Sequence, residues 1–221
     1  MFTPDSREYN HGYLKAKAAQ VARHEERHGP SAEPDRLPPG QVKTDRFPIL
    51  DLGVRPTRDL YPMWKVTAEG LVEHPMEWKL DELRKLGEVD QTSDFHCVTR
   101  WSAYDLHWTG VPFASILEAV RPKPEVGHVI FHSFDGYTTN VSLEELNKPN
   151  VFVAFALEGK EIAPEHGGPV RMIIPQLYGW KSAKFLTMIR FVEEDEPGFW
   201  EVRGYNNHGD PWVEERYTPH L

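Results

Sequence analysis

The sequence has little cysteine, no excess of positive charge and no long hydrophobic run. Its 221 residues include one cysteine, Cys97, which excludes an internal disulfide and a zinc site built from several cysteines. The formal net charge of −9 argues against nucleic-acid binding, because an acidic chain does not neutralise phosphates. The strongest apolar run, residues 151–157, is far shorter than the roughly 20 residues of a membrane-spanning helix. We therefore expect no nucleic-acid partner and no membrane span.

Several common signals are also missing. The N-terminal residues lack the basic start and apolar stretch of a signal peptide, and no twin-arginine pair precedes an apolar segment. We therefore expect a cytoplasmic protein. The G-x-G-x-x-G, Walker A and G-x-S-x-G patterns do not occur, which argues against these nucleotide-binding loops and against a serine-hydrolase elbow.

The first 46 residues differ from the rest, because they are polar, rich in proline and poor in large hydrophobic side chains. Residues 13–28 are compatible with a polar helix that Gly29-Pro30 ends, and residues 31–43 with an extended linker. We therefore predict a polar N-terminal arm and linker over residues 1–46, packed on the surface of a domain that covers residues 47–221.

The arm contains a match to the zinc-peptidase pattern H-E-x-x-H, from His24 to His28. In such enzymes the two histidines bind zinc one helical turn apart, and the glutamate is the general base. The surrounding residues are polar, which instead favours a solvated helix with two surface histidines.

From Phe47 onward, short apolar runs alternate with turn residues. They predict strands near residues 64–68, 95–99, 126–131, 137–141, 151–157, 170–174 and 185–191. Short helices are expected over residues 78–85 and 112–119, with a helical turn at 143–146. The pattern predicts an α+β fold with a mixed β-sheet core and short connecting helices.

Two segments contain side chains with candidate chemistry. Cys97 lies between His96 and Arg100 and is interpreted as a small core residue, a thiolate nucleophile or a thiolate metal ligand. The run H-G-G-P-V-R-x-I-I-P-x-x-Y-G-x-K-S-A-K, residues 166–184, combines glycines and prolines with cationic side chains. This combination is typical of an anion site, most simply for phosphate, although a turn with solvated lysines has the same composition.

Together these segments resemble the sulfite oxidase family. The run at 166–184 resembles its pyranopterin-binding segment, and F-x-C-V-x-x-W-S, residues 95–102, resembles its molybdenum–cysteine loop. The two motifs occur in the family's order. The similarity extends over about residues 47–215 and is greatest to the bacterial branch that includes the catalytic subunit of a periplasmic methionine-sulfoxide reductase.

The resemblance implies a molybdenum–molybdopterin cofactor and a sulfite oxidase-like domain. Cys97 corresponds to the metal ligand, with Arg100 and Arg203 as candidate catalytic residues. The candidate cofactor-binding residues are Asp51, Ser133, Asp135, His166, Arg171, Ser182, Ala183 and Lys184.

Two departures weaken sulfite as the substrate. Phe155 stands where sulfite oxidases have a tyrosine, and the cysteine loop is shorter than their arginine-bearing form. The resemblance therefore implies two-electron oxygen-atom transfer on a small molecule such as a sulfoxide, an N-oxide or an oxyanion. No heme, flavin or iron–sulfur motif occurs, so a separate electron donor or acceptor is expected. The alternatives are a non-catalytic molybdopterin carrier and a metal-free thiol enzyme that uses Cys97.

Overall fold

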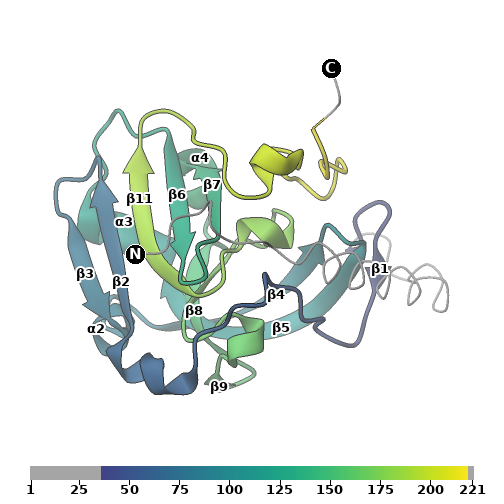
Figure 1. The fold of residues 1–221 in the computed structure, drawn as a ribbon, viewed down its shortest axis with the longest axis horizontal. Helices are drawn as coiled ribbons and strands as arrows, with labels where there is room; N and C mark the ends of the chain where they lie inside the picture. The colour runs from purple at the N-terminus through teal and green to yellow at the C-terminus, as the bar shows by residue number, and fades with distance from the viewer. Residues whose placement is uncertain (1–35, 219–221) are drawn as a thin grey trace.

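The apolar runs form two mixed β-sheets in the computed structural model, which describes residues 36–218 (Figure 1). The first sheet contains β1 (Val42–Lys43), β4 (Val89–Cys97), β5 (Trp101–Pro112), β8 (Phe152–Leu157), β9 (Lys160–Glu161) and β10 (Arg171–Ile173). The second contains β2 (Lys65–Gly70), β3 (Met76–Lys79), β6 (His128–Ser133), β7 (Thr138–Ser142) and β11 (Leu186–Val192).

Short helical segments connect the strands. The α-helices are α2 (Leu80–Arg84), α3 (Phe113–Val120) and α4 (Leu143–Leu146). The 3₁₀ turns are η2 (Arg58–Met63), η3 (Pro164–His166), η4 (Gly179–Lys181) and η5 (Glu201–Arg203). Within the described part of the chain, no helix is both long and apolar enough to cross a membrane. These elements confirm the expected mixed-sheet fold with short helices.

The order of the strands explains how distant segments meet. In the first sheet the order is β1-β5-β8-β10, with β4 paired to β5 and β9 paired to β8. The second sheet has the order β3-β2-β11-β6-β7. The β1–β5 and β2–β11 pairs are parallel, and the other pairs are antiparallel. Parallel pairs need long connections, so residues far apart in the sequence lie on neighbouring strands.

The main hydrophobic core combines side chains from both sheets. Val66 and Phe131 of the second sheet, and Val111 and Val153 of the first, are fully buried in one cluster with Phe113 of α3. Burying a side chain of this size stabilises the fold by about 1.5–3 kcal/mol. The core therefore fixes the two sheets relative to each other.

Two local predictions were wrong. The helix expected over residues 78–85 begins at Leu80, because Trp78 is buried in β3 and pairs with Val66. The longest strand, β5, was missed because its sequence W-S-A-Y-D-L-H-W-T-G-V-P does not alternate cleanly between polar and apolar residues. Its pairing with β4 and β8 determines the structure there.

Only the end of the predicted arm falls within the described residues. Val42 and Lys43 form β1 and pair with Trp101 and Ser102 at the start of β5. The boundary between residues 46 and 47 stays a prediction. The helix expected over residues 13–28, with its H-E-x-x-H pattern, lies outside the described residues.

Candidate cofactor and metal site

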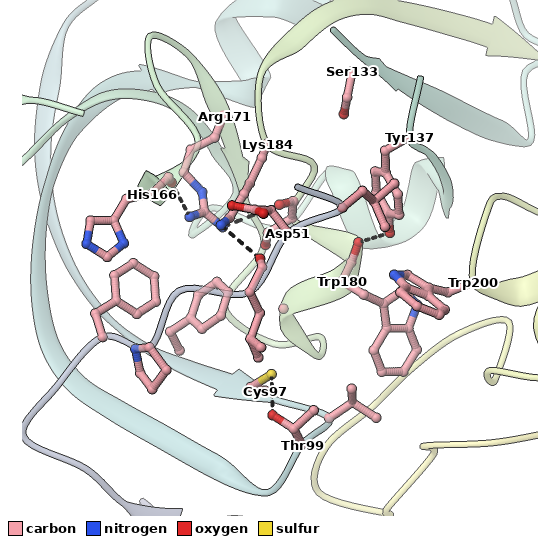
Figure 2. A pocket seen from close by; sticks show the side chains of 18 of the residues that line it. Asp51, Cys97, Thr99, Ser133, Tyr137, His166, Arg171, Trp180, Lys184 and Trp200 are labelled. Carbon is pink, nitrogen blue, oxygen red and sulfur yellow. Dashed lines mark hydrogen bonds between the residues drawn. The ribbon is translucent and has the colours of Figure 1, made fainter. Parts of the chain in front are cut away.

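A cavity lies where the β4–β5 turn meets residues 47–52, the β6–β7 turn and the segment after β10 (Figure 2). Its volume is about 190 Å³. Most of the residues predicted to bind a cofactor line this cavity, together with the predicted metal ligand: Asp51, Cys97, Ser133, Asp135, His166, Arg171, Ser182 and Lys184. The fold thus brings both sequence motifs to one place.

Cys97 ends β4 on one wall of the cavity and is partly buried. Its Sγ lies 3.1 Å from Oγ1 of Thr99 (Figure 2). The backbone turns tightly here, because the amide of Arg100 donates to the carbonyl oxygen of Cys97 at 3.0 Å. Burial raises the pKa of the Cys97 thiol, and the charges of Lys184 and Arg216 lower it in part. A thiol whose pKa is raised is a poor free nucleophile, whereas a soft metal can bind the same sulfur as a thiolate.

Arg171 begins β10 and is 1% exposed. Its guanidinium donates to the carbonyl oxygens of His166 at 2.7 Å and of Ser182 at 3.4 Å. The rings of Phe95 and Trp108 lie 5.3 and 5.5 Å from its central carbon. Burial lowers its pKa to about 9. No carboxylate pairs with this guanidinium among residues 36–218, so its charge is not neutralised there.

Lys184 places a second cation beside Arg171 (Figure 2). Its Nζ donates to the carbonyl oxygens of Leu50 and Glu165, each at 2.9 Å. Burial and the charge of Arg171 lower its pKa to about 7, although Asp51 and Asp135 oppose this shift. The described residues give its ammonium no carboxylate within ion-pair distance. Two neighbouring buried cations without a counterion are costly, and a bound anion would compensate them.

His166 lies near Arg171 and Lys184 at the cavity, but its imidazole is neutral. Its ring stacks on Phe47, with centroids 4.9 Å apart. Burial, together with Lys184 and Arg171, lowers its pKa. The neutral imidazole can therefore both donate and accept a hydrogen bond toward a ligand.

Three polar side chains approach the cavity from the other segments. Asp51 is 1% exposed at its side chain and accepts a hydrogen bond from Nε of Arg55 at 2.7 Å. Asp135 accepts from the amide of Tyr137 at 3.1 Å in the β6–β7 turn. Ser133 is 6% exposed, and its buried Oγ has no hydrogen-bond partner among residues 36–218. A buried hydroxyl without a partner is uncommon, so Ser133 is available to a ligand.

The other three predicted residues do not line the cavity. Arg100 is exposed and has a left-handed backbone with φ 72°. Arg203 is exposed, and its guanidinium donates to Phe199 O at 2.7 Å and covers that ring. Ala183 is buried, and its carbonyl accepts from the amide of Met172 at 2.8 Å. The neighbouring residue Ser182, which does line the cavity, accepts a hydrogen bond at its Oγ from the amide of Ile174 at 3.0 Å. The roles assigned to these residues stay predictions.

Sequence reasoning missed an aromatic wall beside Cys97. It is formed by four residues: Tyr137, Trp180, Trp200 and Tyr205. Tyr205 lies 5.2 Å from Trp180 and 4.9 Å from Trp200 between ring centroids. Tyr137, Trp200 and Tyr205 occur in segments that also resemble the family, but neither that resemblance nor the aromatic content of 12% says which rings face a cavity.

The residues present fit a phosphate-bearing cofactor with a sulfur-ligated metal. Arg171 and Lys184 supply charge for a phosphate, the unpartnered Oγ of Ser133 supplies a hydrogen bond, and Cys97 supplies one soft ligand. No group of three or more His, Cys, Asp or Glu side chains able to hold a metal occurs within residues 36–218. A metal at Cys97 therefore needs its other ligands from a cofactor.

Comparisons with known proteins agree with this fit. Residues 53–200 match the family described as oxidoreductase molybdopterin binding domain. The chain is 40% identical over 188 residues to the uncharacterized oxidoreductase YuiH of Bacillus subtilis, covering 85% of this chain and 95% of YuiH. It is 31% identical over 162 residues to the protein-methionine-sulfoxide reductase catalytic subunit MsrP of Ralstonia nicotianae. That match covers 66% of this chain and 49% of MsrP, so the chain spans about half the length of that relative.

A solved structure shows the same fold. The sulfane dehydrogenase SoxCD from Paracoccus pantotrophus superimposes with a TM-score of 0.56 at 18% sequence identity. The match covers 65% of this chain and 41% of the SoxCD chain. The sequence matches and the fold agree, and the chain belongs to the oxidoreductase molybdopterin binding domain family, as an enzyme of the sulfite oxidase type.

Proposed function

We propose that this enzyme holds a molybdenum–molybdopterin cofactor and catalyses two-electron oxygen-atom transfer on a small substrate. The observation that supports this most directly is the arrangement of Cys97 opposite Arg171 and Lys184 in one cavity (Figure 2). A soft sulfur ligand and two unneutralised buried cations are what a metal–dithiolene group with a phosphate tail requires.

The protein's residues have separate roles in this proposal. Arg171, Lys184 and Ser133 bind and orient the cofactor, while Cys97 ligates its metal. The cofactor supplies the redox chemistry. In the reductive direction, two electrons and two protons enter, and the products are the deoxygenated substrate and one water. In the oxidative direction, one water supplies the oxygen, and two electrons and two protons leave.

A sulfoxide is the favoured substrate among the three classes. The wall of Tyr137, Trp180, Trp200 and Tyr205 offers apolar contact area beside Cys97, which suits a neutral molecule better than an oxyanion. The exposed positions of Arg100 and Arg203 leave these guanidinium groups outside the cavity lining. The relatives named methionine-sulfoxide reductases support the same preference. An external electron donor completes the proposal, and the cytoplasmic location expected from the sequence stays a prediction.

Metal content tests the proposal. Protein purified from a molybdenum-replete host that makes the pterin is expected to contain about one molybdenum per chain. It should also show a thiolate-to-molybdenum charge-transfer band and reduce a methyl sulfoxide with a chemical electron donor. Folded protein with less than about a tenth of an equivalent of molybdenum would contradict it.

The same measurements separate the alternatives. A metal-free thiol enzyme would react rapidly with iodoacetamide and contain no metal. A carrier would contain molybdenum, release it readily and turn over no acceptor or donor. Burial of the Cys97 thiol, which raises its pKa, already disfavours the thiol enzyme.

A further inference from the structure

The turn that carries Cys97 is held by two segments from opposite ends of the described chain. The first segment is residues 39–44, which include β1, and the second is residues 214–216. Both segments lie outside residues 53–200, over which the family match extends. The two segments that hold the turn are therefore not part of the matched domain.

Gln41 makes the first contact. Its side chain is 5% exposed, and its Nε2 donates to the carbonyl oxygen of Cys97 at 2.9 Å. The same carbonyl accepts the amide of Arg100, which closes the turn. The amide of Val42 donates to the carbonyl of Arg100 at 2.9 Å, and the amide of Thr44 donates to that of Ser102. The arm thus binds both ends of the turn through its backbone and one side chain.

Arg216 makes the second contact from the C-terminal side. Its Nη1 donates to the carbonyl oxygen of Val98 at 2.7 Å, and its Nη2 donates to that of Pro39 at 3.2 Å. Arg216 is 6% exposed, and its guanidinium lies over the ring of Tyr178, 4.9 Å from the centroid. One buried cation therefore joins the cysteine turn, the arm and the C-terminal segment.

Gly40 allows the close approach of these segments. Its φ is +67°, and a Cβ added there would lie 2.6 Å from a carboxylate oxygen of Glu214. The carboxylate of Glu214 lies 3.6 Å from Nε of Arg216. A side chain at residue 40 would therefore displace the half-exposed carboxylate of Glu214, crowd Nη2 of Arg216 at 3.3 Å and strain the left-handed backbone.

We infer that Gln41 and Arg216 are positioning residues for Cys97, and that they fix the direction in which its sulfur faces the cavity. They touch the backbone of Cys97 and Val98 and do not line the cavity themselves. Hydrogen bonds at two successive carbonyls restrict the peptide between them, and through it the Cα–Cβ direction of Cys97. The role of these residues in catalysis rests on the proposed molybdenum function, whereas their hold on the turn does not.

The first test uses cofactor-free protein and the rate at which iodoacetamide alkylates Cys97. Gln41→Met and Arg216→Met remove the donors while keeping much of the side-chain length. Because the charge of Arg216 also lowers the pKa of the Cys97 thiol, the rates compared are those of the thiolate, taken from the pH dependence of alkylation. We expect this rate to increase about tenfold, because losing one hydrogen bond shifts a local opening equilibrium by roughly that factor. Arg216→Lys keeps one donor for Val98 and should restore most of the protection.

A matched control is available on β4. Nε2 of Gln91 donates to the carbonyl of Asn150 at 2.9 Å, which is the same kind of contact outside the cavity lining. Gln91→Met should leave the alkylation rate unchanged. If Gln41→Met and Arg216→Met are folded and react no faster than Gln91→Met, the inference is wrong. If either methionine variant fails to fold, Gly40→Ala tests the same contacts without removing a hydrogen-bond donor.

The second test uses the loaded enzyme. Gln41→Met and Arg216→Met should broaden or shift the thiolate-to-molybdenum charge-transfer band and lower kcat with little change in KM. Gln91→Met should change neither. An unchanged band and kcat in both variants would overturn the catalytic part of the inference. Faster alkylation in protein that never takes up molybdenum would instead keep the hold on Cys97 and contradict the proposed function.

Discussion

Lys181 and Lys184 lie three residues apart, and their ammonium groups have opposite surroundings. Nζ of Lys181 lies 2.7 Å from a carboxylate oxygen of Glu201 and 2.8 Å from the carbonyl of Asn140. Within residues 36–218, Nζ of Lys184 donates only to carbonyl oxygens, those of Leu50 and Glu165. One lysine therefore stabilises the fold, and the other is available to an anionic ligand.

Neutral substitutions should separate these two roles. The side chains of Lys181 and Glu201 are 0% and 2% exposed, so Lys181→Met leaves a buried carboxylate unpaired. We expect it to lower the free energy of unfolding by about 3–5 kcal/mol. Lys184→Met should not lower it in cofactor-free protein, because the buried ammonium has no carboxylate partner within residues 36–218 and is costly there, but it should abolish most molybdenum binding. Urea unfolding and molybdenum content measure the two effects. Equal losses of stability in the two variants would contradict this division.

The stability of the cofactor-free protein should depend on pH through Lys184. Its pKa is about 7 in the folded protein and near its ordinary value of about 10.4 in the unfolded chain. Between pH 7 and pH 9 the unfolded chain therefore binds a proton that the folded protein does not. Stability from this group rises with pH there, by at most about 1.4 kcal/mol per unit. The window ends at about pH 10, where the lysine of the unfolded chain also loses its proton.

The measurement is the difference in unfolding free energy between wild-type protein and Lys184→Met. Urea titrations at several pH values from 6 to 9 supply it. Wild-type protein should gain stability relative to the variant as the pH rises above 7, and the difference should be constant below it. A difference that is constant over the whole range would show that Lys184 keeps an ordinary pKa.

Arg171→Lys should lose cofactor although it keeps the charge. The guanidinium reaches the carbonyl oxygens of His166 and Ser182 at once and lies among aromatic rings, which one ammonium cannot reproduce. A lost charge-assisted hydrogen bond is worth roughly 1.5–3 kcal/mol, or about tenfold to over a hundredfold in affinity. Molybdenum per chain is the measurement, with Lys160→Ala on the exposed strand β9 as the control. Full metal content in Arg171→Lys would contradict the assignment of Arg171 to a phosphate-binding site.

Cys97→Ser should keep the cofactor and lose turnover. The variant replaces a soft thiolate by a hard, mostly protonated hydroxyl, while Arg171 and Lys184 remain. We expect bound pterin near the wild-type amount, no thiolate-to-molybdenum band and activity at background. Retained turnover would show that Cys97 is not the ligand.

The residues named from the sequence mostly line one cavity, whereas the surroundings of that cavity were predicted less well. Residue types alone left several interpretations open for Cys97, Arg171 and Lys184, and the resemblance of both motifs to one family placed them in one site. Asp51 was harder, because residues 47–52 reach the cavity only through the fold of the whole chain.

The misses have a common physical cause. Trp78 was assigned to a helix by its local pattern, but it pairs with Val66 on the neighbouring strand. The aromatic wall at Trp180, Trp200 and Tyr205 likewise depends on how the segment after β11 returns to the cavity. Arg100 follows Cys97 closely, yet its left-handed backbone places the side chain at the surface. In each case tertiary pairing outweighs local preference.

The cavity wall combines residues that are far apart in the sequence, and this determines when during synthesis the cavity can form. Phe47 from the beginning of the domain and Tyr205 near its end line the same space, with Cys97 and Lys184 between them in the sequence. Residues 47–205 must therefore all have left the ribosome before the pocket has every wall, since it lacks one until residue 205 has emerged. Under the proposed function, the cofactor enters only after that point, and until then Arg171 and Lys184 share the cavity without a bound anion.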